Sequence, residues 1–116
     1  MKSIISVAII SCVALTSCYT TSSKLYSWHS YEDAAYNYQK KATDEAQMKL
    51  IEEYSRMAGG QKESRGVVPP GFNAEYGYLL FKTGKTEEGI KMMKDEIKLY
   101  PESETYVSRI IKQIEK

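Results

Sequence analysis

The sequence is poor in the side chains that build metal centres and covalent cross-links. It has two cysteines and a single histidine, His29, so a zinc site of the usual cysteine and histidine type lacks ligands. Neither charge is in excess, because 16 Lys and Arg residues stand against 15 Asp and Glu residues. This balance excludes a nucleic-acid binder that works through a basic surface. No segment alternates long enough to predict a β-strand, and we expect no metal, no cofactor and no nucleic-acid partner.

The first eighteen residues have the pattern of a bacterial lipoprotein signal. A short positive start, Met1-Lys2, precedes an almost wholly apolar run over 4–15, which is too short to span a bilayer. The run ends in Leu15-Thr16-Ser17-Cys18, which resembles the lipobox. In lipobox proteins the cysteine receives a diacylglyceryl group, the chain is cut before it, and the new amine is acylated with chains such as palmitate. We therefore expect a signal peptide over 1–17 and lipidation of Cys18. The alternative is an ordinary secretory signal in which Cys18 is incidental.

Lipidation of Cys18 has consequences for stability and location. Cys12 leaves with the signal and the Cys18 sulfur becomes a thioether, so no disulfide is possible and the fold depends on packing. Tyr19 stands where an aspartate, by resemblance to enterobacterial lipoproteins, would hold the product in the inner membrane. We therefore expect an outer-membrane lipoprotein that faces the periplasm. Residues 18–24, mostly Thr and Ser after Tyr19, are expected to form a short lipidated tether.

Residues 25–116 predict one small all-α domain of about five helices. Apolar residues recur in five segments at spacings of 3 and 4, typical of helices: Trp28, Tyr31, Ala35 and Tyr38; Leu50, Ile51, Tyr54, Met57 and Ala58; Tyr76, Leu79 and Leu80; Ile90, Met93 and Ile97; and Tyr106, Val107, Ile110, Ile111 and Ile114. The second helix should start at Thr43-Asp44, with a capping box of Asp44 and Gln47, and end at Gly59-Gly60. The fourth should open with Thr86 as its cap.

The segment 59–71 interrupts this pattern. It reads GGQKESRGVVPPG, which is too rich in glycine and proline for a helix. A loop of this length in a small domain is often functional. The other interpretation is a plain connector between two helical hairpins.

The second half of the chain carries landmarks of a tetratricopeptide repeat. With Pro70 as position 1 of a 34-residue window, Gly77 falls at position 8, Gly84 at 15, Gly89 at 20 and Pro101 at 32. We expect Gly77 and Gly89 to face each other where two helices cross, and Gly84 to adopt a left-handed turn conformation. Asn73 and Glu96 stand where the pattern usually has Trp and Ala. The first half, 25–58, reads as a degenerate repeat with Trp28 in that Trp position, and the last helix as a cap.

The loop and the repeat together resemble a known family. The runs SRGVVPPG over 64–71, AEYGYLL over 74–80 and YPES over 100–103, with LYSW over 25–28 and YNY over 36–38, are similar to small bacterial lipoproteins with a domain of unknown function. Members are commonly encoded beside two other lipoproteins. One resembles the curli-secretion channel protein, and the other resembles a surface-antigen lipoprotein with a fold like that of the periplasmic Tol-Pal component. The resemblance implies a subunit or accessory of an outer-membrane lipoprotein assembly, and it supplies no catalytic residues.

The tyrosine-rich helices suggest a partner-binding surface. In a tetratricopeptide-like hairpin the concave face of the first helix would display Ala74, Tyr78, Phe81 and Lys82. Exposed aromatic residues beside a cation are typical of protein interfaces, and Arg65 of the loop would add a second cation. The alternative is that these side chains are simply exposed.

The remaining polar residues give weak signals for catalysis. His29 beside Trp28 reads as a packing or surface residue. The pairs Glu52-Glu53 and Glu87-Glu88, with Lys49, Arg56 and Lys91 at helical spacing, predict solvated faces with ion pairs. Glu75 is placed beside the loop without a second carboxylate, which a glycosidase would need.

Three functional hypotheses follow. The leading one is a non-enzymatic adaptor that docks its helical face onto other envelope proteins. The second is a module that binds or acts on peptidoglycan, with Glu75 and Arg65 in its site. The third is a structural subunit that only stabilises a neighbouring channel.

Overall fold

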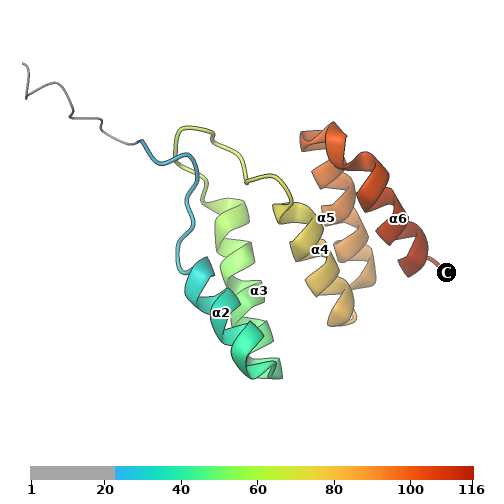
Figure 1. The fold of residues 1–116 in the computed structure, drawn as a ribbon, viewed down its shortest axis with the longest axis horizontal. Helices are drawn as coiled ribbons and strands as arrows, with labels where there is room; N and C mark the ends of the chain where they lie inside the picture. The colour runs from blue at the N-terminus through green and yellow to red at the C-terminus, as the bar shows by residue number, and fades with distance from the viewer. Residues whose placement is uncertain (1–22) are drawn as a thin grey trace, which may run out of the picture.

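The computed structural model describes residues 23–116, which form a wholly helical domain (Figure 1). Its elements are α2 (Tyr31–Lys41), α3 (Asp44–Gly59), α4 (Phe72–Lys82), α5 (Thr86–Leu99), the short 3₁₀ helix η1 (Pro101–Ser103) and α6 (Glu104–Ile114). The predicted all-α class with a C-terminal helix is confirmed. The expected signal peptide, Cys18 and most of the tether lie outside the described residues. Within 23–116, no helix has the length and apolar character needed to cross a membrane.

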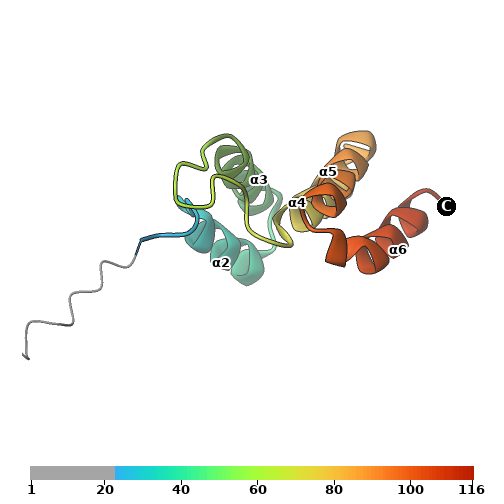
Figure 2. The same cartoon turned by 90° about the horizontal axis from the view of Figure 1, so that it is seen from above.

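The helices form two antiparallel hairpins and one additional helix. Helices α2 and α3 make the first hairpin, α4 and α5 make the second, and α6 packs against the second (Figure 1). Seen from above, α3 and α5 lie on one side, α2 and α6 lie on the other, and α4 joins the two halves (Figure 2). Helices α2 and α6 therefore lie on the same side of the domain, with α4 between the two hairpins.

Local sequence accounts for both ends of α3 but not for the start of α5. Helix α3 begins after Thr43, whose side chain accepts a hydrogen bond from the Ala46 N–H at 3.3 Å, and it ends at Gly59. The predicted start and stop are thus confirmed, but the capping box is wrong because Thr43 caps the helix one residue before Asp44. The predicted cap Thr86 is also wrong, since it is the first residue of α5 and Lys85 precedes it without a side-chain cap.

The first predicted helix starts later than its apolar spacing suggests. Helix α2 begins at Tyr31, and Trp28 lies in the preceding turn, where its carbonyl accepts from the Tyr31 N–H at 3.1 Å. His29 interrupts the helix because its φ of 47° is left-handed. Trp28 is therefore not on the helical face and is 41% exposed.

The core consists of two clusters that share α4. The larger one joins α3, the loop and α4, and its buried residues are Leu50, Tyr54, Met57, Val68, Phe72 and Leu79. The smaller one joins α5 and α6 and contains Met93, Val107 and Ile111. The segment 59–71 is tied down at Val68, which is buried and whose carbonyl accepts from the Tyr100 hydroxyl at 2.6 Å.

The second hairpin has the close helix crossing that the repeat pattern predicts. A Cβ atom on Gly77 would collide with the Gly89 carbonyl oxygen, and a Cβ on Gly89 would collide with that of Gly77. Gly84 has a φ of +86° in the turn between α4 and α5, and Pro101 opens η1. All four predicted structural residues therefore occupy the roles expected of them.

One departure from the repeat pattern, Glu96, caps the helix that carries the other, Asn73. The Glu96 side chain is 1% exposed, and its carboxylate accepts from the Gly71 N–H at 2.6 Å and the Asn73 N–H at 3.0 Å. Gly71 has no side chain with which to cap α4, so α5 supplies a carboxylate to this helix N-terminus, where the helix dipole favours negative charge. Where most repeats pack an alanine, this hairpin has a polar cap.

Candidate functional site

A groove between α4 and α6 is the candidate binding site. It has a volume of about 330 Å³, and its lining comes from these two helices. Its lining residues are Ala74, Glu75, Tyr78, Tyr106, Ile110 and Gln113. We call this the α4–α6 groove.

The groove combines a small residue between the helices with two exposed aromatic rings. Ala74 is half-buried against the α5–α6 core cluster. Tyr78 from α4 and Tyr106 from α6 are 48% and 69% exposed. A second hollow shares Ala74, Glu75 and Tyr106 and extends the groove to Pro70 and Gly71. The groove therefore runs from the 59–71 loop along α4, with its tyrosines open to solvent.

The structure brings two of the predicted partner-binding residues into the groove and leaves the others outside it. Ala74 and Tyr78 line the groove as predicted. Phe81 contacts the Tyr78 ring, with centroids 6.1 Å apart, but it does not line the groove. Lys82 turns toward α2, where its Nζ donates to the Tyr38 hydroxyl at 3.1 Å and lies 5.8 Å from the ring centroid. The hydrogen bond to Tyr38 raises the pKa of Lys82.

Arg65 is held in a different part of the domain from the groove lining. Its backbone N–H donates to the Leu25 carbonyl at 3.3 Å, within the loop that precedes α4. The side chain is exposed and contributes to neither hollow of the groove. The proposed grouping of Arg65 with the groove aromatics is therefore not what the structure shows.

Glu75 joins the groove to the first hairpin. Its Oε2 accepts from the Tyr54 hydroxyl at 2.8 Å and from the Tyr31 hydroxyl at 3.3 Å. Burial is the main cause that raises the pKa of both tyrosines, strongly for Tyr54. The Tyr54 ring also stacks on Tyr76, with centroids 5.2 Å apart. The carboxylate of Glu75 thus links α2 and α3 to α4 and holds the wall of the groove in position.

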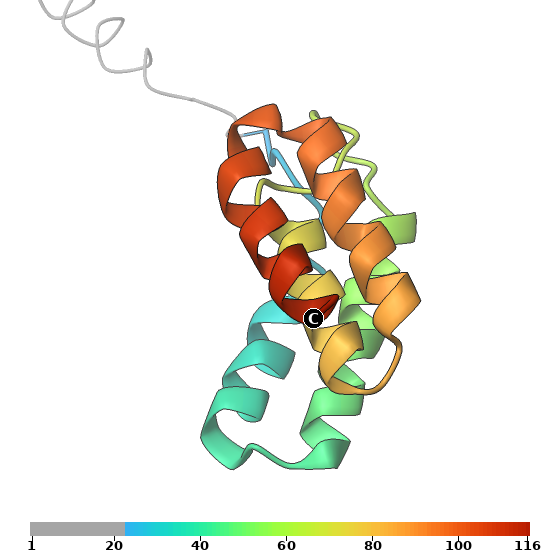
Figure 3. The same ribbon diagram turned by 90° about the vertical axis from the view of Figure 1, so that its right-hand side faces the viewer.

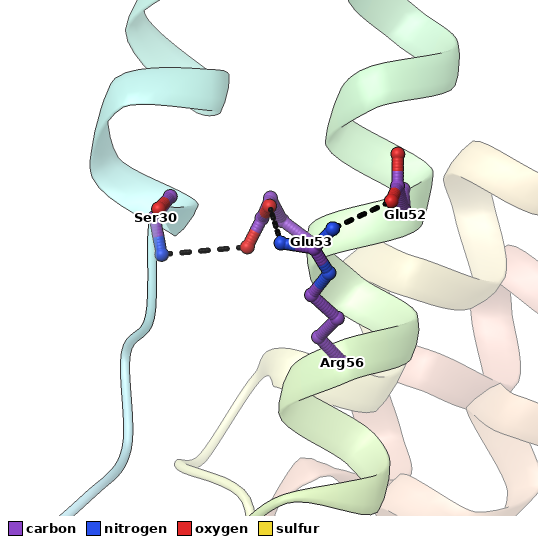
Figure 4. A network of polar contacts seen from close by, with 4 residues as sticks. All are labelled: Ser30, Glu52, Glu53 and Arg56. Atoms are coloured by element: carbon purple, nitrogen blue, oxygen red, sulfur yellow. Dashed lines mark hydrogen bonds and ion pairs between the residues drawn. The ribbon is translucent and has the colours of Figure 1, made fainter.

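Glu53 corrects the prediction of a fully solvated face. Arg56 pairs with Glu52 at 2.7 Å on the surface and with Glu53 at 3.0 Å (Figure 4). Glu53 is 8% exposed, and its Oε2 accepts from the N–H of Ser30, the N-cap residue of α2, at 3.3 Å. Lys49 pairs with Glu45 instead, at 3.1 Å. The packing of α3 against the start of α2 within this hairpin, which local spacing does not reveal, accounts for the buried carboxylate of Glu53.

The two buried carboxylates show that the hairpins follow one plan. In each hairpin the second helix supplies a glutamate, Glu53 or Glu96, to the N-cap N–H of the first helix. The pairs are separated by 23 and 25 residues. This supports the interpretation of the first half as a degenerate repeat of the second. Sequence reasoning missed both roles, although Glu96 was visible as a departure from the repeat pattern.

His29 and Glu88, two further residues weighed for catalysis, lie on the surface. His29 is exposed in the turn before α2 and lies next to Gly60. Glu88 lies on a solvated face, 66% exposed and 4.0 Å from Lys85. Over residues 23–116, no set of three or more His, Cys, Asp or Glu side chains is placed to hold a metal ion.

Comparison with known proteins places the chain in a family. A family model described as "Domain of unknown function (DUF4810)" matches residues 25–110, which span both hairpins and most of α6. Neither the curated proteins nor the solved structures contain a match to this chain. Because the family model covers most of the sequence, the chain belongs to the DUF4810 family.

Proposed function

We propose that this protein is a lipid-anchored, non-enzymatic adaptor of the bacterial outer membrane. It faces the periplasm, carries acyl chains on Cys18, and binds another envelope lipoprotein through the α4–α6 groove. The partners that the family resemblance implies are a curli-secretion-channel-like lipoprotein and a surface-antigen-like lipoprotein. The observation that carries the proposal is the pair of solvent-exposed tyrosines, Tyr78 and Tyr106, that open onto one groove.

The chemistry of the groove suits a protein ligand. Tyrosine supplies a large apolar area and a hydroxyl at low cost in side-chain entropy, and it is enriched where proteins bind one another. Ile110 adds an aliphatic side chain, and Glu75 and Gln113 add polar groups. A segment with apolar side chains and hydrogen-bond donors fits this lining.

The groove wall is held in place before a partner arrives. Glu75 is fixed by the hydroxyls of Tyr31 and Tyr54, and Ala74 packs on the α5–α6 core. A preformed site loses less conformational entropy on binding. The capped N-terminus of α4 and the Gly77–Gly89 crossing therefore serve the binding face by keeping α4 in register with its neighbours.

The experiment is site-specific photocrosslinking in the native envelope. A photoreactive phenylalanine analogue is placed at Tyr78 or Tyr106, and at Tyr36 as the matched control, since Tyr36 is 63% exposed on α2 and does not line the groove. The proposal expects one envelope lipoprotein crosslinked from Tyr78 and Tyr106 and absent from Tyr36. Equal crosslinking from all three positions, or crosslinks only to peptidoglycan, would overturn the adaptor assignment.

The anchor is tested separately. Intact-mass measurement of the membrane-extracted protein should show a chain that begins at Cys18 and carries acyl groups, and Cys18→Ser should leave the protein unprocessed or released from the membrane. Density-gradient separation of the two membranes then checks its location. Recovery with the inner membrane would contradict the assignment that rests on Tyr19.

A further inference from the structure

Exposed apolar side chains gather at one end of the domain. The loop 60–71 spans this end, between the segment 23–28 beside the end of α3 and the C-terminal end of α5 (Figure 1), and we call it the loop end. Its large exposed hydrophobic residues are Leu25, Trp28, Val67 and Leu99, at 52%, 41%, 39% and 44% exposure. Leu25 and Trp28 line one hollow, and Val67 and Leu99 line another.

Positive side chains lie among these apolar groups. The segments 23–28 and 60–71 contain Lys24, Lys62 and Arg65 against the single carboxylate of Glu63. The end of α5 adds one charge of each sign, Lys98 and Asp95, beside Leu99. Lys24 and Lys62 line the same hollow as Leu25 and Trp28. The three cations of the two segments are exposed. Apolar side chains flanked by Lys and Arg are the composition that binds the interface of a bilayer.

The loop end is an ordered framework. Ser27 exchanges two hydrogen bonds with the Gln61 side chain, from its N–H to Oε1 and from Nε2 to its carbonyl, both at 3.0 Å. The Ser64 N–H donates to the Lys24 carbonyl at 3.4 Å. The Tyr26 and Trp28 rings meet edge to face, with centroids 6.2 Å apart. The exposed side chains are therefore presented together from a fixed backbone.

The tether limits how far this end lies from the lipid. Four residues lie between Cys18 and Ser23, and the five Cα–Cα steps of a fully extended chain reach at most about 18 Å. An acylated Cys18 lies at the level of the headgroups, so the loop end is held close to them. We propose that the loop end rests on the bilayer, with Leu25, Trp28 and Leu99 at the boundary of headgroups and acyl chains and the cations on lipid phosphates. This proposal rests on the lipid anchor proposed above.

This orientation sets the direction in which a partner approaches. Helices α4 and α6 begin at the loop end and run away from it (Figure 3). The α4–α6 groove therefore stands upright from the membrane, with Tyr106 nearer the lipid than Tyr78. A partner docks from the side, as another membrane-anchored protein would.

Trp28 is a native probe of this contact because it is the only tryptophan. The full acylated protein is purified and reconstituted into phosphatidylethanolamine–phosphatidylglycerol vesicles in which brominated lipid replaces part of the unlabelled lipid. Bromine quenches only an indole that lies in the acyl-chain boundary. We expect a roughly two-fold loss of Trp28 emission, in keeping with the preference of tryptophan for the membrane interface.

Two variants separate docking from mere attachment. The double change Leu25→Asp and Leu99→Asp should restore most of the emission, whereas Met48→Asp should not, because Met48 is 60% exposed near the start of α3, away from the loop end. Acylated protein that floats with the vesicles while Trp28 stays unquenched overturns the orientation and leaves the adaptor proposal standing. Quenching that persists in the double variant also overturns it. If the native protein purified from cells carries no acyl groups on Cys18 and does not associate with the vesicles, both the orientation and the anchor are wrong.

Discussion

Replacement of Glu96 should destabilise the domain far more than any exposed glutamate. Its carboxylate is buried at 1% exposure and accepts from the N–H groups of Gly71 and Asn73 at 2.6 and 3.0 Å. Hydrogen bonds to a charged group contribute about 1.5–3 kcal/mol each, so Glu96→Ala should lower the free energy of unfolding by about 3–5 kcal/mol. Glu96→Gln keeps one acceptor oxygen but turns an amide NH₂ toward the other N–H, and should cost about 1–3 kcal/mol.

The assay is urea unfolding followed by far-ultraviolet circular dichroism, on a chain with Cys18→Ser so that it stays unacylated. Glu88→Ala is the matched control, because Glu88 lies on the same helix with 66% exposure and a long 4.0 Å contact to Lys85. An exposed ion pair of this kind should change stability by about 0.5 kcal/mol or less. If Glu96→Ala and Glu88→Ala lower stability equally, the buried cap does not hold α4 and the reasoning is wrong.

Three further results are expected. Gly77→Ala should cost about 1–3 kcal/mol through collision with the facing helix, whereas Gly59→Ala, with no atom within 4 Å, should be neutral or stabilising; thermal unfolding of both variants checks this. Tyr54→Phe should cost about 1–2 kcal/mol at neutral pH. Because the folded pKa of Tyr54 lies above its ordinary value of about 10, unfolded chains lose that proton first. Stability should therefore fall as pH rises past 10, and less steeply in Tyr54→Phe, in urea titrations at alkaline pH. Gln61→Ala should free the backbone at Ser27, seen as faster amide exchange over 24–28 with global stability nearly unchanged.

Periodicity and glycine placement predicted the helices because those signals are local. The spacing of apolar residues fixes which face of each helix is buried, and Gly77 and Gly89 fixed the crossing of α4 and α5, since only glycine permits backbones so close. The stop of α3 at Gly59 followed from the same local chemistry. These features need no knowledge of the rest of the fold.

The misassigned residues depend on contacts between elements. Trp28 has the right spacing for α2, yet the left-handed conformation of His29 means that the helix begins only at Tyr31. Glu53 and Glu96 look like surface glutamates in the sequence. In the structure, each carboxylate accepts a hydrogen bond from an N–H at the start of the other helix of its hairpin. Tyr106 was counted with the apolar spacing of the last helix, but it is 69% exposed and lines the groove. Packing between elements decides the cases of Glu53, Glu96 and Tyr106, and the backbone conformation of His29 decides that of Trp28.

The same buried glutamates link the fold to its proposed use. A helix in a tetratricopeptide-like stack is normally held by neighbours on both sides, yet this domain has only two hairpins and α6. Carboxylates at the N-termini of α2 and α4 and the Glu75–Tyr54 bond across helices add directional contacts where a longer array would add apolar area. Polar bonds of this kind fix helix register more strictly than apolar packing does, because their geometry is narrow. A domain built in this way can keep one side of α4 free for the groove without losing the alignment on which a binding surface depends.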